Sequence, residues 1–284
     1  MSERAGGGGA PRSALYVPGD RPGMLRGAAG RGADALIVDL EDAVPPAGKD
    51  AARAAVADWL AARPAAPAPG PRIWVRVNAG ERGRADLRAV AGPAVTGLFV
   101  AKAGSVRELT ALARLLDAVP GAEHLALCPV LESAAAVLGA ADLARCPRVA
   151  RLQLGEADLR ADLGVDPGPG EPELLWVRSH VVLVSAAAGL AAPLAPASTD
   201  IRDLDALRRG TLALKRLGFH GRTCVHPAQV PVVNDVFTPA PDELARARDL
   251  VARFDATAEG VILDDRGRMV DEAVVRRARR LLSP

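Results

Sequence analysis

The run Ala33-Asp34-Ala35-Leu36-Ile37-Val38-Asp39-Leu40-Glu41-Asp42-Ala43-Val44 contains the features from which the fold of this chain is inferred. Its apolar first half predicts a strand that is buried on both faces, as in parallel sheets. Three carboxylates, Asp39, Glu41 and Asp42, follow at the C-terminal end, where α/β sheets and barrels place their chemistry. These acids repel one another unless a cation lies nearby. A solvated helix cap after the strand is the alternative interpretation.

Composition limits the class of protein. At 284 residues the chain suits one barrel, one doubly wound domain or two smaller domains. A net charge of +2 and an aromatic content of 3% argue against a nucleic-acid partner. Cys128, Cys146 and Cys224 are widely spaced, which predicts reduced, buried thiols in a cytoplasmic protein. No stretch has the length of a membrane span, so we expect no membrane association.

The remainder of the chain alternates predicted strands with predicted helices. We expect strands at 15–17, 35–40, 73–78, 97–102, 125–131, 149–154, 190–194 and 222–225. We expect helices at 24–31, 49–62, 106–118, 174–189, 204–217, 242–254 and 272–282. Eight strands, each followed by a helix or helix-like segment, predict a (β/α)8 TIM barrel, with an open doubly wound sheet as the alternative.

Three regions follow from this pattern. Residues 1–12, which include the glycine row at 6–9, are expected to be a flexible N-terminal tail. Residues 13–235 are expected to form the barrel as the catalytic domain. Residues 236–284 contain two predicted helices around a hairpin, and we expect a C-terminal helical extension that packs on the barrel or on a neighbouring subunit.

In a barrel, residues at the C-terminal ends of the strands share one mouth. The charged residues at these ends are Asp39, Glu41, Asp42, Arg76, Lys102, Glu132, Asp158 and His226. Glu132 and Asp158 follow adjacent strands, and carboxylate oxygens are the ligands that Mg²⁺ prefers. For Asp158, the alternative to metal binding is a structural role at the start of a helix, as an N-cap or first-turn carboxylate favoured by the helix dipole.

The cationic residues of this set have more than one interpretation. Arg76 stands inside a strand, where burial is costly unless it meets an anion, and its planar fork fits a carboxylate. An ion pair with Asp39 or Asp42 is the structural alternative. Lys102 could contact a phosphate, pair with a carboxylate or be a solvated charge at the rim. His226 is expected to be a structural histidine, with catalysis as the alternative.

A set of short motifs resembles the citrate lyase beta subunit and its relatives in the aldolase/citrate lyase superfamily. The motifs occur in the same order from about Arg12 to the C-terminus. They are Arg12-Ser13, Val17-Pro18-Gly19-Asp20-Arg21-Pro22, Asp39-Leu40-Glu41-Asp42-Ala43-Val44, Arg76-Val77-Asn78, Leu131-Glu132-Ser133, Leu154-Gly155 with Asp158-Leu159, Gly218-Phe219-His220-Gly221, His226-Pro227-Ala228-Gln229-Val230 and Met269-Val270-Asp271.

The resemblance implies a Mg²⁺-dependent (β/α)8 barrel that assembles as a homotrimer or hexamer. It implies cleavage of a carbon–carbon bond in a 3-hydroxyacyl-CoA, with citryl-CoA giving acetyl-CoA and oxaloacetate. Malyl-CoA or citramalyl-CoA cleavage, thioester hydrolysis, aldol chemistry on free 2-oxo acids, or a non-catalytic subunit that binds an acyl-CoA or 2-oxo acid are the alternatives. Other subunits of a citrate lyase complex are possible partners.

The resemblance also assigns roles to individual residues. It makes Glu132 and Asp158 the metal ligands, and it makes Arg76 the catalytic clamp on the substrate carboxylate. It adds Glu132 and Arg12 to the residues that contact substrate. Arg21 and Lys102 are candidates for contacts with the CoA nucleotide.

Further residues are implied to act around the metal or from a neighbouring subunit. Asp39, Glu41 and Asp42 would orient metal-bound water. Asp271 would enter the mouth of a neighbouring subunit as a catalytic proton-transfer group, and a helix N-cap is its alternative role. The chain departs from the family pattern at Ala195, where relatives carry an aspartate, which puts substrate choice in question.

Overall fold

The computed structural model describes residues 10–257 and 260–282 of the chain. These residues belong to two compact units, divided after Phe237. The glycine row at 6–9 lies outside the described residues. Each unit is described by itself below.

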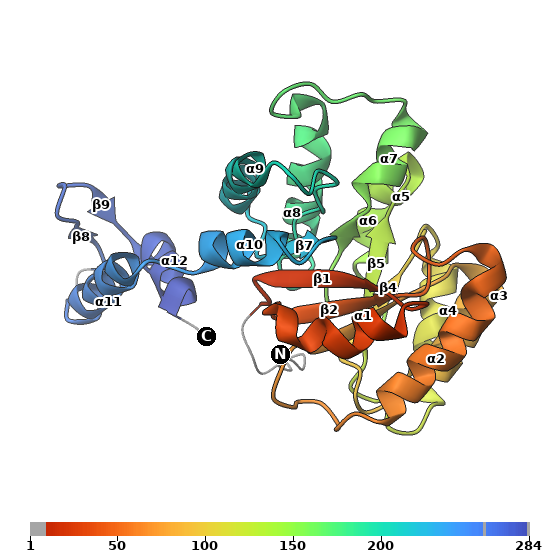
Figure 1. Ribbon diagram of the computed structural model, residues 1–284. Coiled ribbons are helices and arrows are strands. Elements are labelled where there is room, and N and C mark those ends of the chain that lie inside the picture. Colours follow the sequence, from red (N-terminus) through yellow and green to blue (C-terminus); the bar gives the residue numbers. More distant parts are fainter. Residues whose placement is uncertain (1–9, 258–259, 283–284) are drawn as a thin grey trace. The chain divides into compact units, whose positions relative to one another are not determined.

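The first unit contains a sheet of seven parallel strands in the order β6-β5-β4-β3-β2-β1-β7 (Figure 1). The strands are β1 (Ser13–Pro18), β2 (Ala35–Asp39), β3 (Arg72–Val77), β4 (Gly97–Val100), β5 (Ala126–Leu131), β6 (Gln153–Leu154) and β7 (Arg222–Cys224). β2, the strand of the acidic run, is buried at every residue, as the apolar pattern predicts. The sheet is therefore of the parallel α/β kind.

The strand expected at 190–194 does not form, so this prediction is wrong. Pro193 interrupts the segment and Pro196 follows it closely, and a proline cannot donate to a strand ladder. Single bridges remain, one from Leu194 to β6 and one from Ala195 to β7. These bridges connect the two edge strands of the curled sheet, in keeping with a TIM-barrel type of fold.

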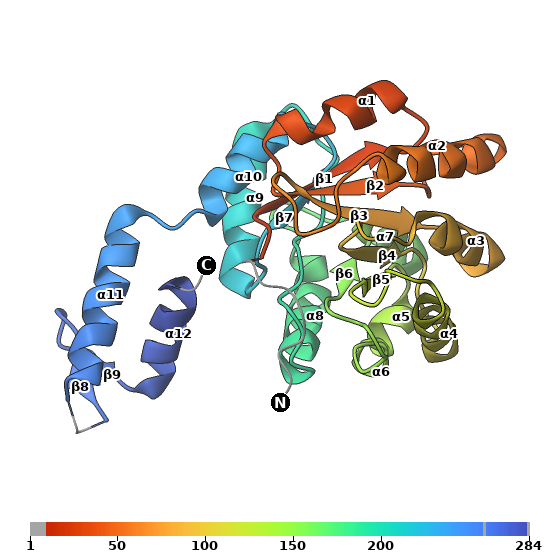
Figure 2. The same cartoon turned by 90° about the horizontal axis from the view of Figure 1, so that it is seen from below.

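Helices surround the strands of this unit (Figure 2). They are α1 (Pro22–Gly27), α2 (Lys49–Ala61), α3 (Gly80–Val90), α4 (Val106–Asp117), α5 (Ala134–Leu138), α6 (Ala140–Leu143), α7 (Glu156–Leu163), α8 (Leu175–Ala187), α9 (Leu204–Leu217) and α10 (Gln229–Phe237). Side chains cap several N-termini, as where the Ser133 hydroxyl accepts a hydrogen bond from the Ala136 N–H and begins α5. Helices α3, α5, α6, α7 and α10 were not among the helices expected. Few residues of α3 are apolar, and the other four are only four to nine residues long.

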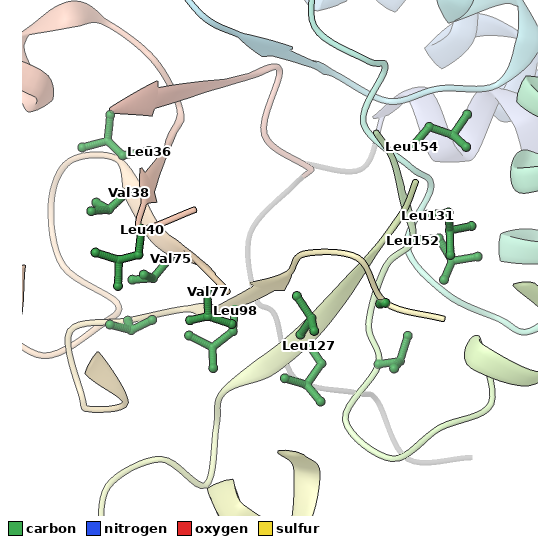
Figure 3. Close-up of a cluster of buried hydrophobic side chains, with 14 of the residues drawn as sticks. Leu36, Val38, Leu40, Val75, Val77, Leu98, Leu127, Leu131, Leu152 and Leu154 are labelled. Carbon is green, nitrogen blue, oxygen red and sulfur yellow. The ribbon is translucent and has the colours of Figure 1, made fainter. Parts of the chain in front are cut away.

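Buried side chains lie on both faces of the sheet because successive strand residues point to opposite sides. The larger cluster lies between the sheet and the helices, and Figure 3 shows its strand residues, among them Leu36, Val38 and Leu127. A smaller cluster on the opposite face contains Ala35, Ile37 and Cys128, among others. This second face is the interior of the curled sheet.

The second unit contains two helices and a short hairpin. They are α11 (Pro241–Asp255), β8 (Ile262–Leu263), β9 (Met269–Val270) and α12 (Glu272–Leu282), and the two strands pair antiparallel. This arrangement matches the expected hairpin between helices. Across residues 10–257 and 260–282, no helix combines the length and apolar character needed to cross a membrane. All three cysteines are free and buried, as predicted.

Truncating Leu36 tests the packing between sheet and helices. Its side chain is fully buried, so Leu36→Ala is expected to lower the free energy of unfolding by about 2–5 kcal/mol. Leu138→Ala is the control, because Leu138 is 72% exposed and its loss is expected to change stability by less than about 0.5 kcal/mol. Urea unfolding measures both. Equal losses in the two variants would contradict this description of the core.

Candidate active site

Three charged side chains continue the inward-facing rows of the sheet. Asp39 follows Ala35 and Ile37 on the same face of β2, and Arg76 is its partner in register on β3. Glu132 follows Val130 by two residues on the extension of β5. The alternation of the strands therefore places Asp39, Arg76 and Glu132 at one end of the interior.

Arg76 forms a two-pronged ion pair with Asp39. The Arg76 Nε donates to Asp39 Oδ1 at 2.7 Å, and Nη2 donates to Oδ2 at 2.6 Å. The remaining Nη1 lies 3.1 Å from both Glu41 Oε2 and Asp42 Oδ2. Burial alone would lower the pKa of Arg76, but Asp39 outweighs it and the pKa is raised. The ion pair left open as an alternative is thus the arrangement observed.

Backbone and side-chain donors fix the turn that carries the acids. The Asp39 carboxylate accepts hydrogen bonds from the backbone N–H groups of Glu41 and Ala43 at 2.8 and 3.1 Å. The buried Lys49 ammonium donates to the carbonyls of Leu40 and Glu41. Lys49 was not among the predicted site residues. Only its place in the first turn of the next predicted helix hinted at this role.

Lys102 connects the acidic turn to Glu132. Its backbone adopts a left-handed conformation with a φ of 51°. Its N–H donates to Glu132 Oε2, and its ammonium donates to Glu41 Oε1. Burial acts to lower the pKa of Lys102, but the hydrogen bond and charge of Glu41 raise it overall. Lys102 is therefore a cation at the mouth, paired with a carboxylate.

Glu132 is buried in a space that exists because residue 155 is a glycine. A Cβ on Gly155 would lie 2.3 Å from Glu132 Cγ and 2.8 Å from Oε1. Glu132 is only 6% exposed, and this burial raises the pKa of its carboxyl group from 4.5 to about 7. A bound cation would favour the charged form of Glu132, which its surroundings otherwise disfavour.

A buried ion pair next to Asp158 anchors its helix. Asp158 lies in the first turn of α7, and Glu156 begins that helix. Arg178 of α8 donates to both carboxylate oxygens of Glu156 at 2.7 Å and to Glu171 Oε2 at 2.6 Å. Breaking a buried pair of this kind is costly, so α7 is held against α8 and the position of Asp158 is fixed.

The geometry brings Glu132, Asp158 and Asp42 together. One carboxylate oxygen from each lies within 4.8 Å of the other two. A pocket of about 380 Å³ opens beside them, lined by Lys102, Glu132, Ser133, Asp158 and Asp162. Hard carboxylate oxygens beside an open pocket suit Mg²⁺, which keeps positions free for water and substrate. The residues present thus fit a divalent cation.

Three other residues singled out from the sequence have partners of their own. Arg12 precedes β1 and forms a two-pronged pair with Asp34, at the opposite end of the strands from Glu132. His226 is exposed, and its Nδ1 accepts a hydrogen bond from the Ala228 N–H. Asp271 belongs to the second unit, where its Oδ1 caps α12 by accepting from two backbone N–H groups.

Filling the space at Gly155 is expected to weaken metal binding. In Gly155→Ala the new methyl group displaces the Glu132 carboxylate, and we expect Mg²⁺ affinity to fall by about 10- to 100-fold. Isothermal titration calorimetry measures this affinity. Gly104→Ala is the control, because a Cβ there meets no atom within 4 Å and should leave affinity unchanged. Unchanged affinity in Gly155→Ala would contradict the assignment of Glu132.

The raised pKa of Glu132 predicts a pH dependence of stability in EDTA. Between pH 4.5 and about 7 the unfolded chain has released this proton and the folded chain has not. The folded state binds more protons, so its stability falls as pH rises through this window. Glu132→Gln lacks this contribution and should show a shallower decline in urea unfolding. Parallel profiles for the two proteins would refute the prediction.

The chain is similar in sequence to known proteins. The sequence profile of the HpcH/HpaI aldolase/citrate lyase family matches residues 12–227. The chain is 34% identical over 288 residues to a citrate lyase subunit beta-like protein of Deinococcus radiodurans, covering 96% of each. It is 33% identical over 278 residues to a (3S)-malyl-CoA thioesterase of Cereibacter sphaeroides, covering 96% of this chain and 93% of that protein.

A solved structure agrees with the sequence matches. The CitE protein of Mycobacterium tuberculosis, crystallised with magnesium, acetoacetate and coenzyme A, gives a TM-score of 0.78 at 31% identity. The match covers 95% of this chain and 96% of that one. The expected resemblance is therefore confirmed, and the chain belongs to the HpcH/HpaI aldolase/citrate lyase family.

Proposed function

We propose that this protein is a Mg²⁺-dependent lyase that cleaves the carbon–carbon bond of a 3-hydroxyacyl-CoA, with citryl-CoA as substrate. The observation that carries the proposal is the group formed by Glu132, Asp158 and Asp42 beside an open pocket, with cationic side chains at its edge. The CitE relative, crystallised with magnesium and coenzyme A, supports both the metal and the class of substrate.

Glu132 and Asp158 are the residues that would hold the ion. When bound, Mg²⁺ supplies Lewis acidity to the hydroxyl and carboxylate oxygens of the substrate. Arg76 and Lys102 add positive charge where the substrate carboxylate would lie. Gly155 keeps Glu132 in place, and the Glu156–Arg178 pair does the same for Asp158.

The reaction is a retro-aldol type of cleavage. A base takes the hydroxyl proton, the bond between the carbinol carbon and the thioester α-carbon breaks, and the hydroxyl carbon becomes a ketone. The α-carbon takes the electron pair and then a proton, giving acetyl-CoA and oxaloacetate. Asp271 of a neighbouring subunit is the proposed proton-transfer group, in a homotrimer or hexamer of (β/α)8 barrels in the cytoplasm.

Thioester hydrolysis of malyl-CoA is the second candidate. The 33% identity to a (3S)-malyl-CoA thioesterase over nearly the whole chain favours it. Hydrolysis releases free coenzyme A and malate, whereas carbon–carbon cleavage of malyl-CoA releases acetyl-CoA and glyoxylate. The two reactions therefore differ in whether a free thiol appears.

Turnover of citryl-CoA and malyl-CoA, with and without EDTA, tests the proposal. We expect acetyl-CoA and oxaloacetate from citryl-CoA, loss of the reaction in EDTA, and at least a 100-fold lower rate in Glu132→Ala. A thiol reagent reports any free coenzyme A.

The control is Glu123→Gln, because Glu123 is exposed and its carboxylate accepts a hydrogen bond from the Gly121 N–H, which a glutamine side chain can also accept. It should keep the full rate. Activity that survives EDTA or Glu132→Ala would refute the metal assignment. Release of free coenzyme A in place of acetyl-CoA would favour the thioesterase.

A further inference from the structure

Arg151 is a buried cation without a protein partner. Four cationic side chains are buried in the described part of the chain, and the other three have acceptors. Lys49 donates to backbone carbonyls, Arg178 to a carboxylate and Arg222 to backbone carbonyls. Arg151 is 8% exposed, and its guanidinium has no hydrogen bond or ion pair with any described residue. Burial of an uncompensated charge is costly, so its five N–H donors call for an anion.

The Arg151 side chain faces the interior of the curled sheet. It precedes β6 in a segment whose residues Leu152 and Leu154 belong to the cluster between sheet and helices (Figure 3). Because neighbouring residues of an extended segment point to opposite faces, Arg151 and Gln153 face the interior. Cys128, a member of the interior cluster, is close enough to act on the pKa of Arg151. Neither Arg151 nor Gln153 lines the pocket of the proposed metal site.

The charges around Arg151 favour an anion. Burial has the largest effect on the pKa of Arg151 and lowers it, while the Cys128 thiol acts to raise it. The guanidinium of Arg72, on β3, lowers this pKa further, and no carboxylate of the described residues is among the groups that act on it. Asp34, an acid close to Arg72, is already held in a two-pronged pair by Arg12. The interior near Arg151 therefore has an excess of positive charge.

Gln153 adds an acceptor to these donors. Its Oε1 is buried and accepts no hydrogen bond from the described residues, while its Nε2 donates to the Leu154 carbonyl. Successive positions on one face of a strand are about 7 Å apart, which a long arginine side chain can span. A single small ligand can therefore accept from Arg151 and donate to Gln153. Near neutral pH inorganic phosphate can do both, because it retains a hydroxyl group, whereas sulfate has none.

We propose that the interior of the curled sheet binds an inorganic phosphate ion between Arg151 and Gln153. The planar guanidinium fork would hold two phosphate oxygens, and the phosphate hydroxyl would donate to Gln153 Oε1. The ion would compensate the buried charge and so stabilise the folded chain. This site is separate from the proposed metal site, and the proposal does not depend on the proposed function.

Calorimetry with phosphate and with sulfate tests the proposal on the full chain, at neutral pH, constant ionic strength and in EDTA. We expect phosphate to bind, and sulfate to bind about 3- to 10-fold more weakly because it cannot donate to Gln153. Gln153→Leu should lower the phosphate affinity by the same factor and abolish the preference over sulfate. A wild-type protein that binds no phosphate, or that binds sulfate equally well, would overturn the proposal.

Removal of the guanidinium is expected to have a larger effect. Arg151→Met should lower the phosphate affinity at least about 10-fold, because it loses charge-assisted hydrogen bonds. Arg151→Lys keeps the charge but lacks the fork, and we expect an intermediate loss. Arg145→Met is the control, since the Arg145 side chain is 71% exposed and pairs with Asp142. It should bind phosphate as the wild type does. Wild-type affinity in Arg151→Met, or an equal loss in Arg145→Met, would contradict the site.

Urea unfolding gives a second readout. In chloride, Arg151→Met is expected to be at least as stable as the wild type, because an apolar side chain replaces a buried charge without a partner. Phosphate should raise the urea midpoint of the wild type and leave that of Arg151→Met unchanged. A lower midpoint for Arg151→Met in chloride would mean that the protein itself compensates Arg151, and would overturn the proposal.

Discussion

The ion pair between Arg76 and Asp39 is the interaction on which the rest of the mouth depends. It joins the C-terminal ends of β2 and β3 through two hydrogen bonds of 2.6 and 2.7 Å. Both side chains are largely buried, so removal of one partner would leave an uncompensated charge at a cost of about 3–5 kcal/mol. The pair aligns the guanidinium and begins the turn that presents Glu41 and Asp42.

The proposed metal ligands, Glu132 and Asp158, come from another part of the sheet and depend on different supports. Glu132 needs the space that Gly155 leaves and the N–H that Lys102 offers in its unusual backbone conformation. Asp158 depends on the ion pair that Glu156 and Arg178 form behind it. Parallel pairing of the strands brings these separately supported acids to one end of the sheet interior.

The sequence predicted the features that depend on local pattern. The apolar run of β2 and the acids that follow it were placed correctly. The ends of β5 and β6, after which Glu132 and Asp158 come, were also placed correctly. The strand expected at 190–194 failed because Pro193 lacks the N–H that a ladder needs, and only single bridges remain. Helix α3 was missed because its apolar positions are sparse, with Leu87 and Val90 supplying most of its buried apolar surface.

Features that depend on packing could not be predicted in the same way. Which acid pairs with Arg76 is set by the register of β2 against β3, which composition does not reveal. The role of Gly155 depends on the position of a side chain on another strand. Arg12 stands beside a predicted strand, but at the end opposite Glu132, where it pairs with Asp34.

The most direct test of the central claim is anomalous diffraction from crystals soaked in Mn²⁺. The account predicts one anomalous peak between the carboxylates of Glu132 and Asp158, within about 2.2 Å of an oxygen from each. A fully occupied peak elsewhere, or no peak at this position in crystals that take up the metal, would contradict it.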